Sequence, residues 1–167
     1  YRVPALDKRL VTERTRAEAR LIHAARKGGV HTPVMRDITD DTIVMEQVQG
    51  TLLTLDLSDN NVREAGRMVG LLHSAGIMHG DLTTSNLIVR GSDRKCVMID
   101  FGLAQVTSEI EQRGVDIHVL FQTLESTAPE RSEDLKAAFA EGYRETFPGV
   151  GEVITREHEI RQRGRYL

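Results

Sequence analysis

Several common features are scarce or missing in this sequence. There is one cysteine, Cys96, so no disulfide can form within the chain. No apolar run approaches about 18 residues and no signal peptide is visible, so no membrane span is predicted and a cytoplasmic location is the simplest expectation. The net charge of −3 predicts no bulk affinity for nucleic acid. The remaining composition is typical of one globular domain, or of one and a half small lobes.

The charged residues that are present are unevenly distributed. Residues 1–27 contain eight Lys or Arg against three acids, and residues 37–64 contain seven acids against one Arg. The stretch from Arg161 to Arg165 is basic again. Two interpretations are open: ordinary solvated faces, or two basic patches that contact RNA or an acidic partner surface.

The hydrophobic pattern predicts a helix, a hairpin, a second helix, a loop, a second hairpin and further helices. The predicted ranges are 5–27 and 61–76 for the first two helices, 34–38, 42–48, 87–89 and 96–99 for the strands, and 109–125, 132 onward and 150–163 for the last helices. Asn61 is the predicted N-cap of the second helix, and Ser132 that of a later one. Val115, Val119 and Leu120 are expected to face inward.

Two short strings carry the chemistry of the chain. Residues 79–86 are His-Gly-Asp-Leu-Thr-Thr-Ser-Asn, and Asp100-Phe101-Gly102 begins fourteen residues after Asn86. An HGD tripeptide alone is weak evidence, but an Asn five residues after the Asp, followed by a hairpin and DFG, is specific. Together the strings provide what transfer of a phosphoryl group from Mg-ATP needs on one side of a nucleotide cleft.

Asp81 is the predicted catalytic residue, which orients the attacking oxygen or accepts its proton. Asn86 is predicted to place a neutral oxygen on Mg²⁺, and Asp100 a charged oxygen on the same ion. ATP and Mg²⁺ are therefore the expected cofactors. His79 is expected to pack under the loop and to hydrogen-bond to the backbone. The other five histidines show no ligand spacing, so no zinc site is predicted.

Glu18, in the first predicted helix, is expected to bind nucleotide through a lysine that holds the phosphates. A surface ion pair with Arg14 is the alternative. That lysine and a Gly-rich loop would precede the helix, where the sequence has only a few residues. Residues 1–47 are therefore interpreted as the remainder of an N-lobe, and residues 48–167 as a C-lobe with a basic tail. The predicted fold class is α+β, a protein-kinase-like fold with a mostly helical C-lobe and an N-lobe reduced to a helix and a short hairpin.

Residues 45–48 stand where a strand would lead into the hinge between the lobes. Backbone groups of Glu46 and Val48 are predicted to meet the edge of adenine, with Met45 at the back of the pocket. A buried strand end explains the same residues equally well.

Three features differ from signalling protein kinases. Gly80 stands where those enzymes usually have an arginine that binds a phosphorylated activation loop, and Thr83 where they usually have a lysine. Only thirteen residues separate Gly102 from Asp116, and no Ala-Pro-Glu lies between them. Regulation by loop phosphorylation and the usual docking of peptide substrates are therefore not expected.

The chain resembles the small atypical kinase subunit of the KEOPS complex, a relative of the RIO kinases once called piD kinase. The resemblance runs nearly end to end and is carried by residues 1–7, 14–19, HGDLTTSN, Ile-Asp-Phe-Gly-Leu-Ala, Val115-Asp116 and the closing Arg-Gly-Arg. It implies a minimal bilobal kinase that supports threonylcarbamoyladenosine modification of tRNA, chiefly as an ATPase, with Ser/Thr phosphorylation also ascribed to it. The implied partners are the threonylcarbamoyl-transferase subunit, fused upstream in some archaea, a small regulatory subunit, and tRNA through the complex.

By position, the resemblance assigns Asp81 as the catalytic carboxylate, Asn86 and Asp100 as metal ligands, and Glu18 as the helix glutamate. It also implies that Asp116 braces the backbone of the catalytic loop. The basic tail with Arg161, Arg163 and Arg165 is implied to be tied to tRNA and to the active site.

Two other classes of function stay open. One is a small-molecule phosphotransferase of the aminoglycoside or choline kinase type, which also has an HGD loop but usually lacks Phe-Gly after the metal-binding Asp. The other is a non-catalytic interaction module. The sequence does not identify the physiological phospho-acceptor.

Overall fold

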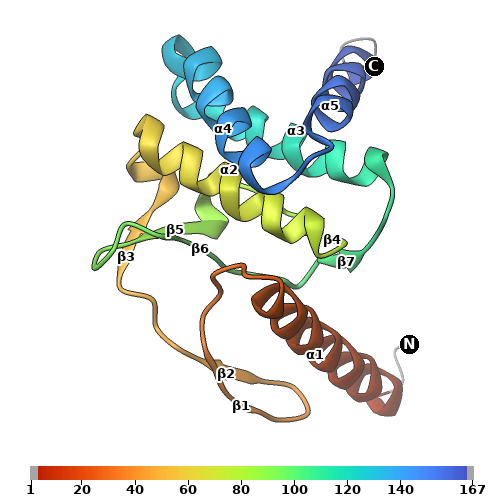
Figure 1. Ribbon diagram of the computed structural model, residues 1–167. Helices are drawn as coiled ribbons and strands as arrows, with labels where there is room; N and C mark the ends of the chain where they lie inside the picture. The colour runs from red at the N-terminus through yellow and green to blue at the C-terminus, as the bar shows by residue number, and fades with distance from the viewer. Residues whose placement is uncertain (1–3, 165–167) are drawn as a thin grey trace.

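The computed structural model describes residues 4–164 of the chain. A long helix, α1 (Pro4–Lys27), is followed by a hairpin of β1 (Met35–Ile38) and β2 (Ile43–Met45). The rest of the described range consists of helices and two small sheets, arranged above α1 and the hairpin in Figure 1. The predicted order of elements and the α+β class with a mostly helical second half are therefore confirmed.

Two small antiparallel sheets contain the strands that flank the HGD loop and the DFG segment. β5 (Leu87–Arg90) pairs with β3 (Gly50–Leu52) on one side and with β6 (Cys96–Met98) on the other. β4 (Ile77–Met78) pairs with β7 (Gln105–Val106). The sequence predicts β5 and β6 but not β3, β4 or β7, because strands of two or three residues show no periodic pattern. The β4–β7 ladder joins the start of the HGD loop to the segment that follows DFG.

The helices α2 (Asp59–Ser74), α3 (Ile110–Thr127), α4 (Ser132–Thr146) and α5 (Val150–Gly164) form the other layer. The backbones of α2 and α4 approach closely because glycines stand at the contact on both helices. A Cβ atom on Gly66 would lie 2.1 Å from Phe139 O, and one on Gly142 would lie 1.8 Å from Arg63 O. Any side chain at either glycine would push the two helices apart. Figure 1 shows α5 lying near α3 and diverging from α4.

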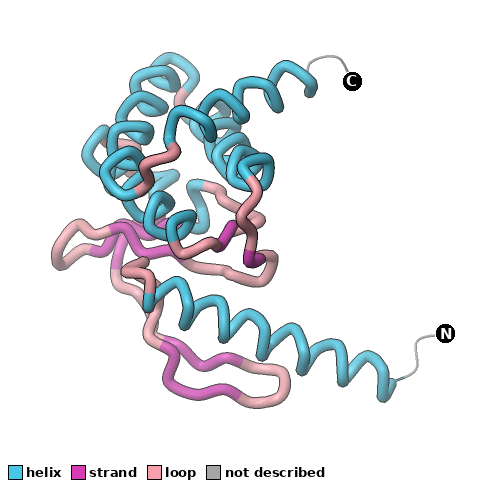
Figure 2. The backbone as a smooth tube through the Cα atoms, turned by 45° about the vertical axis from the view of Figure 1, so that its right-hand side comes forward, coloured by secondary structure: helices cyan, strands magenta, loops and turns pink. Residues whose placement is uncertain are grey.

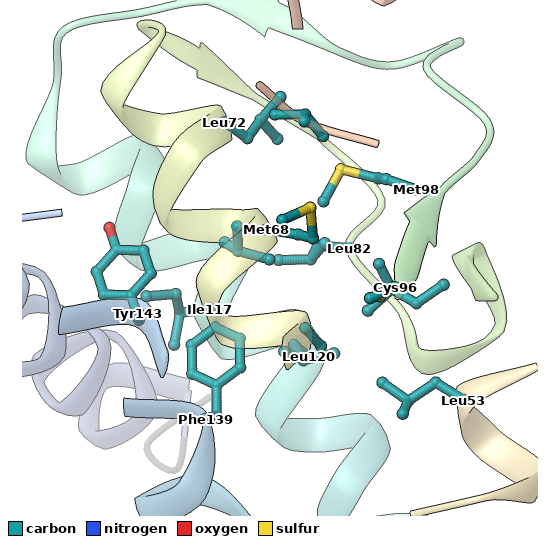
Figure 3. Packing of buried hydrophobic residues seen from close by; sticks show 14 of the residues in the cluster. Leu53, Met68, Leu72, Leu82, Cys96, Met98, Ile117, Leu120, Phe139 and Tyr143 are labelled. Carbon is teal, nitrogen blue, oxygen red and sulfur yellow. The ribbon is translucent and has the colours of Figure 1, made fainter. Parts of the chain in front are cut away.

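The hydrophobic core lies around α2. Met68 and Leu72 of this helix pack near Leu82 of the HGD loop and Met98 of β6 (Figure 3). Cys96 is buried in the same core, and burial raises the pKa of its thiol, which agrees with the predicted packed cysteine. The core therefore supports the loop that carries the predicted catalytic residue.

Two predicted helix caps are wrong. The N-cap of α2 is Ser58, whose hydroxyl accepts a hydrogen bond from Asn61 N (3.3 Å). Asn61 lies in the first turn, where its amide donates to Asp56 O and accepts from the Arg94 guanidinium. Ser132 is the first residue of α4 rather than its cap, and its hydroxyl donates to a carbonyl of the preceding turn. In both cases contacts outside the helix decide which side chain faces the free N–H groups.

The buried face of α3 also differs from the prediction. Leu120 is buried as expected, but Val115 and Val119 are only half-buried. The buried face consists of six residues: Gly114, Asp116, Ile117, Leu120, Phe121 and Leu124. A buried polar residue, Asp116, lies on this face because the HGD loop offers it hydrogen-bond donors, as described below.

The first part of the chain is packed less densely than the helical half. Ile38, Val44 and Met45 of the hairpin are between 37% and 45% exposed. Figure 2 shows α1 and the hairpin extending away from the helices, and His31 O in the connecting loop accepts a hydrogen bond from Met98 N (2.8 Å). The lobe boundary at residues 47 and 48 stays a prediction. In residues 4–164 no helix is long and apolar enough to cross a membrane.

Candidate active site

The HGD loop is fixed in place by a carboxylate beneath it. Asp116 of α3 accepts hydrogen bonds from His79 N and, through its second oxygen, from Gly80 N (2.9 Å). Asp116 is 1% exposed, so its carboxylate cannot accept hydrogen bonds from water and accepts them from these amides instead. The brace that the sequence resemblance implies for Asp116 is confirmed. The carboxylate fixes the backbone that leads directly into Asp81.

Asp81 and Asn86 lie side by side at the two ends of this loop. The Asn86 side-chain amide donates to Asp81 O (2.9 Å) and to Asp81 Oδ2 (3.0 Å). Because both bonds use Nδ2, the amide orientation is set and Asn86 Oδ1 stays available as an acceptor. One oxygen of the Asp81 carboxylate is anchored in the same way. The geometry therefore brings together a fixed carboxylate and a carboxamide oxygen.

Asp100 is attached to this pair through the backbone. Ile99 N donates to Asn86 O (3.0 Å), which places Asp100 next to the end of the HGD loop. Asp100 adopts φ = 61°, a left-handed conformation in which Asp is one of the better-tolerated residues. Its Oδ1 accepts a hydrogen bond from Gly102 N (3.3 Å). The next residue, Phe101, is buried, so the backbone turns the aromatic ring inward and leaves Asp100 exposed.

The His79 side chain connects the HGD loop to the DFG segment. Its Nε2 hydrogen-bonds to Ile99 O (3.0 Å), and its ring lies 5.2 Å from that of Phe101. Asp81 N donates to the other ring nitrogen, Nδ1 (3.3 Å). The expected role of His79, packing under the loop and bonding to the backbone, is confirmed.

Gly80 permits a contact that no other residue would allow. Its φ is 83°, and a Cβ atom there would lie 2.2 Å from Leu103 O. The segment after DFG therefore passes directly over the residue before Asp81. The glycine that marks this chain as different from signalling kinases is thus required by the packing of the two strings.

Glu18 faces this site from α1. Partial burial raises the pKa of its carboxyl, and the negative charge of Asp100 raises it further. No ion pair joins Glu18 to Arg14 among the described side chains, so the alternative surface pair is not observed. The structure therefore places Glu18 close enough to Asp100 for their charges to interact. A helix glutamate that takes part in the site would need this proximity. Its role in nucleotide binding stays a prediction.

Glu46 and Val48 lie on the segment between β2 and β3. Glu46 N donates to Val34 O (2.8 Å), and Glu46 Oε2 accepts from Val34 N (3.1 Å), so the side chain is used to close the hairpin. In the described residues the Glu46 carbonyl and the Val48 N–H have no hydrogen-bond partner. These two groups are free to meet an adenine edge, and this role also stays a prediction.

The donor set suits a hard divalent cation. Asn86 Oδ1 and the Asp100 carboxylate are oxygen ligands, which Mg²⁺ prefers. Among residues 8–164, whose side chains the structure describes, no cluster of three or more His, Cys, Asp or Glu could hold a metal ion on its own. An ion bound here would therefore take most of its ligands from phosphate oxygens and water, as Mg²⁺ in nucleotide sites does.

Two arginines of the predicted basic tail are engaged in ion pairs. Arg161 contacts Glu125 (2.9 Å) and Arg163 contacts Glu111 (2.7 Å), both on α3. Arg165 lies outside the described residues. In this structure the described tail arginines fasten α5 to α3.

Sequence reasoning missed one buried member of the site, His73 of α2. Its Nε2 lies 3.2 Å from Asp116 Oδ2, and the side chain is fully buried. His73 and Asp116 are far apart in the sequence, and a histidine on an apolar helix face gives no local signal of such a partner. The carboxylate that braces the HGD loop is therefore itself held by a second side chain.

Comparison with known proteins shows which family the chain belongs to. A family model described as RIO domain matches residues 4–130. A probable serine/threonine-protein kinase BUD32 homolog from Archaeoglobus fulgidus is 46% identical over all of this chain and 84% of its own length. A probable bifunctional tRNA threonylcarbamoyladenosine biosynthesis protein from Methanoculleus marisnigri is 63% identical over the whole chain, which corresponds to 31% of that relative.

The chain spans about a third of the length of such bifunctional relatives. A solved structure titled "WaaP in complex with acyl carrier protein" is similar with a TM-score of 0.62 at 22% identity, over 89% of this chain and 76% of that one. This similarity supports the protein-kinase-like fold alone. The family match and the BUD32 homolog confirm the resemblance found in the sequence, and the chain belongs to the RIO domain family, in the group that includes the BUD32 homologs.

Proposed function

We propose that this chain binds ATP with Mg²⁺ and transfers or hydrolyses the γ-phosphoryl group. The observation that carries the proposal is the hydrogen bond from Asn86 Nδ2 to Asp81 Oδ2 (3.0 Å). It aligns the two groups and leaves Asn86 Oδ1 and the Asp100 carboxylate for a cation. The name of the Archaeoglobus relative, a serine/threonine-protein kinase homolog, supports the same chemistry.

In the proposed mechanism Asp81 orients the attacking oxygen. One of its carboxylate oxygens is held by Asn86, so the other is free to accept a hydrogen bond from the nucleophile. Phosphoryl transfer has a loose transition state, so holding the nucleophile in line contributes more than early removal of its proton. The Asp116 brace beneath the loop limits how far Asp81 can move.

Asn86 and Asp100 would hold the magnesium ion in this mechanism. When bound, Mg²⁺ supplies positive charge that stabilises the phosphate oxygens. Glu18, on the opposite side, carries a carboxyl whose raised pKa reflects burial and the nearby Asp100. Positive charge held by Asp100 would offset the part of this pKa shift that comes from the Asp100 charge.

The short segment after DFG favours water over a peptide as the acceptor. Only thirteen residues separate Gly102 from Asp116, and β7 and the start of α3 occupy part of them. β7 is hydrogen-bonded to β4, so this segment has little freedom to form a surface that binds a peptide. We therefore favour ATP hydrolysis as the main activity, with Ser/Thr phosphorylation as the secondary one.

We further propose that this activity supports threonylcarbamoyladenosine modification of tRNA. The support is the name of the bifunctional relative from Methanoculleus marisnigri, which is 63% identical to this chain. The expected partners are the threonylcarbamoyl-transferase subunit, a small regulatory subunit, and tRNA through their complex. A cytoplasmic location stays part of this proposal.

The test is release of inorganic phosphate from Mg-ATP by the full-length natural protein and by its Asp81→Ala and Asp100→Ala variants. Each substitution is expected to lower turnover by at least about a hundredfold. Asp134→Ala, which removes an exposed carboxylate on α4, is the matched control and should leave turnover unchanged. Equal turnover in all four proteins would overturn the proposal.

A second measurement separates the two roles. Calorimetry with Mg-ATP should show that Asp81→Ala still binds nucleotide, because that residue contacts the acceptor and not the metal. Asp100→Ala should lose the magnesium-dependent part of the affinity. The tRNA proposal fails separately if threonylcarbamoyladenosine formation by the complete protein system continues at the same rate with Asp81→Ala.

A further inference from the structure

A continuous chain of buried polar groups runs from α4 to the HGD loop. The Tyr143 hydroxyl lies 2.8 Å from His73 Nδ1, and His73 Nε2 lies 3.2 Å from Asp116 Oδ2. Asp116 in turn accepts from His79 N and Gly80 N. The side chains of Tyr143, His73 and Asp116 are at most 1% exposed. This path crosses the three helices α4, α2 and α3, and its first step, from Tyr143 to His73, has no role in the site described so far.

The direction of each hydrogen bond follows from the partners. Asp116 is a carboxylate that already accepts two backbone N–H groups, so His73 must donate to it from Nε2. A neutral histidine that is protonated on Nε2 offers only an acceptor at Nδ1, so the Tyr143 hydroxyl donates. Burial lowers the pKa of His73 and raises that of Tyr143, which keeps both side chains neutral. The tautomer is thus assigned from the network.

The ring of Tyr143 is held independently of its hydroxyl. It stacks on Phe139 with centroids 5.9 Å apart and lies 5.2 Å from the ring of Phe147 (Figure 3 shows Tyr143 beside Phe139). Packing alone would therefore be satisfied by phenylalanine at position 143. The hydroxyl has one partner among the described residues, His73 Nδ1.

We infer that Tyr143 is a positioning residue of the phosphoryl-transfer site. Its hydroxyl orients the His73 imidazole, His73 orients the Asp116 carboxylate, and Asp116 sets the backbone of His79 and Gly80 that leads into Asp81. This inference rests on the proposed function for its effect on turnover, but the hydrogen-bond path can be tested without any activity. The hydrogen-bond path connects α4 to the backbone that leads into Asp81.

The test uses Tyr143→Phe in the full chain, because this change removes one oxygen and keeps the ring. Two spectroscopic readouts are independent of catalysis. The ¹⁵N resonance of His73 Nδ1 should move when it loses its hydrogen-bond donor, and exchange of the Gly80 and His79 amide protons with solvent should become faster. Turnover of ATP should fall about tenfold. Leaving one buried acceptor without its donor is enough to shift the balance between the active orientation of the loop and other orientations by that factor. The KM for ATP should stay the same.

Phe147→Leu is the matched control, since it disturbs the same aromatic cluster and leaves every hydrogen bond of the path in place. It should lower the unfolding midpoint without changing kcat or amide exchange at Gly80. If Tyr143→Phe leaves the Nδ1 resonance and both amide exchange rates unchanged, the inference is overturned, whatever the activity. If these signals change while the wild-type protein hydrolyses no ATP, the path is confirmed and the proposed function fails. An equal loss of kcat in both variants would assign Tyr143 a purely structural role.

Discussion

The two sides of the candidate site are built in different ways. The loops that carry Asp81 and Asp100 lie on the core around α2, and buried groups such as Asp116 hold their backbone. The other side, α1 with Glu18 and the β1–β2 hairpin, leaves apolar side chains such as Ile38 about half exposed. The predicted catalytic groups are thus supported by satisfied buried polar contacts. Glu18, on the other side, is placed mainly by the helix α1.

This difference predicts where substitutions cost most. A buried polar residue in the helical half has partners that would be left unpaired, whereas an exposed polar residue on the hairpin can exchange its partners for water. Of four experiments, ordered from the largest expected effect to the smallest, the first and the last compare the two sides, and the other two measure how closely the helical half depends on its local contacts.

The first compares Asp116→Ala with Asp37→Ala. Loss of Asp116 leaves the amides of His79 and Gly80 and the His73 side chain without their acceptor, and should lower the free energy of unfolding by about 3–5 kcal/mol. Asp37 is exposed on β1, so its removal should cost no more than about 0.5 kcal/mol. Urea unfolding measures both. Similar costs would show that the two sides are equally dependent on their polar contacts.

The second compares two glycines that both adopt a left-handed conformation. Gly76→Ala, at φ = 73° with no atom closer than 3.8 Å to the added Cβ, should cost about 1–2 kcal/mol of unfolding free energy. Gly80→Ala should cost about 1–3 kcal/mol more, because its Cβ would collide with the Leu103 carbonyl. Only Gly80→Ala should also reduce ATP turnover. The result that contradicts this is a loss of turnover in both variants.

The third concerns the start of α2, where the linking segment enters the helical half. Ser58→Ala removes the acceptor for Asn61 N and should lower the free energy of unfolding by about 1 kcal/mol. Ser132→Ala, at the start of α4, removes no cap hydrogen bond and should cost less. Thermal unfolding of the two variants and the wild type gives the comparison. A larger loss for Ser132→Ala would show that the Ser132 hydroxyl contributes more to stability than the Ser58 cap does.

The fourth is a pH dependence on the N-lobe side. The pKa of Glu18 is raised in the folded protein, so ionising it costs the folded state, and stability is lost as pH rises through that folded pKa. Glu18→Gln does not ionise, so at pH 7 it should be more stable than the wild type by less than about 1 kcal/mol. The gain should vanish below the ordinary glutamate pKa of about 4.3. Unfolding midpoints of the two proteins across this pH range give the comparison. Equal midpoints at pH 7 would contradict the raised pKa of Glu18, which burial and the charge of Asp100 cause.

Several features could be predicted because they depend on neighbouring residues. Local pattern and motif spacing predict the helix that ends before Gly28 and Gly29 and the hairpin of β5 and β6. They also identify the two strings HGDLTTSN and DFG. The cap of α2 could not be assigned in this way, since Ser58 and Asn61 are equally good caps by residue type. The choice came from Asp56 and Arg94, which occupy the Asn61 side chain.

Other features depend on residues that are distant in the sequence. The close contact of α2 and α4 depends on two glycines that face each other only in the folded protein. The inward position of Asp116 depends on the amides of His79 and Gly80, and the position of His73 depends on Asp116. Nothing local to any of these residues indicates its partner.

By itself the sequence determined which chemical groups this protein has: a carboxylate, a carboxamide and a second carboxylate at the spacing that phosphoryl transfer uses, without an ordinary activation segment. The tertiary structure decided how these groups are held. Asn86 turns its amide nitrogen to Asp81, and the path through Asp116 and His73 to Tyr143 fixes the loop from beneath. The physical reason is that motif spacing is a property of the chain, whereas satisfying a buried polar group requires partners that only folding brings together.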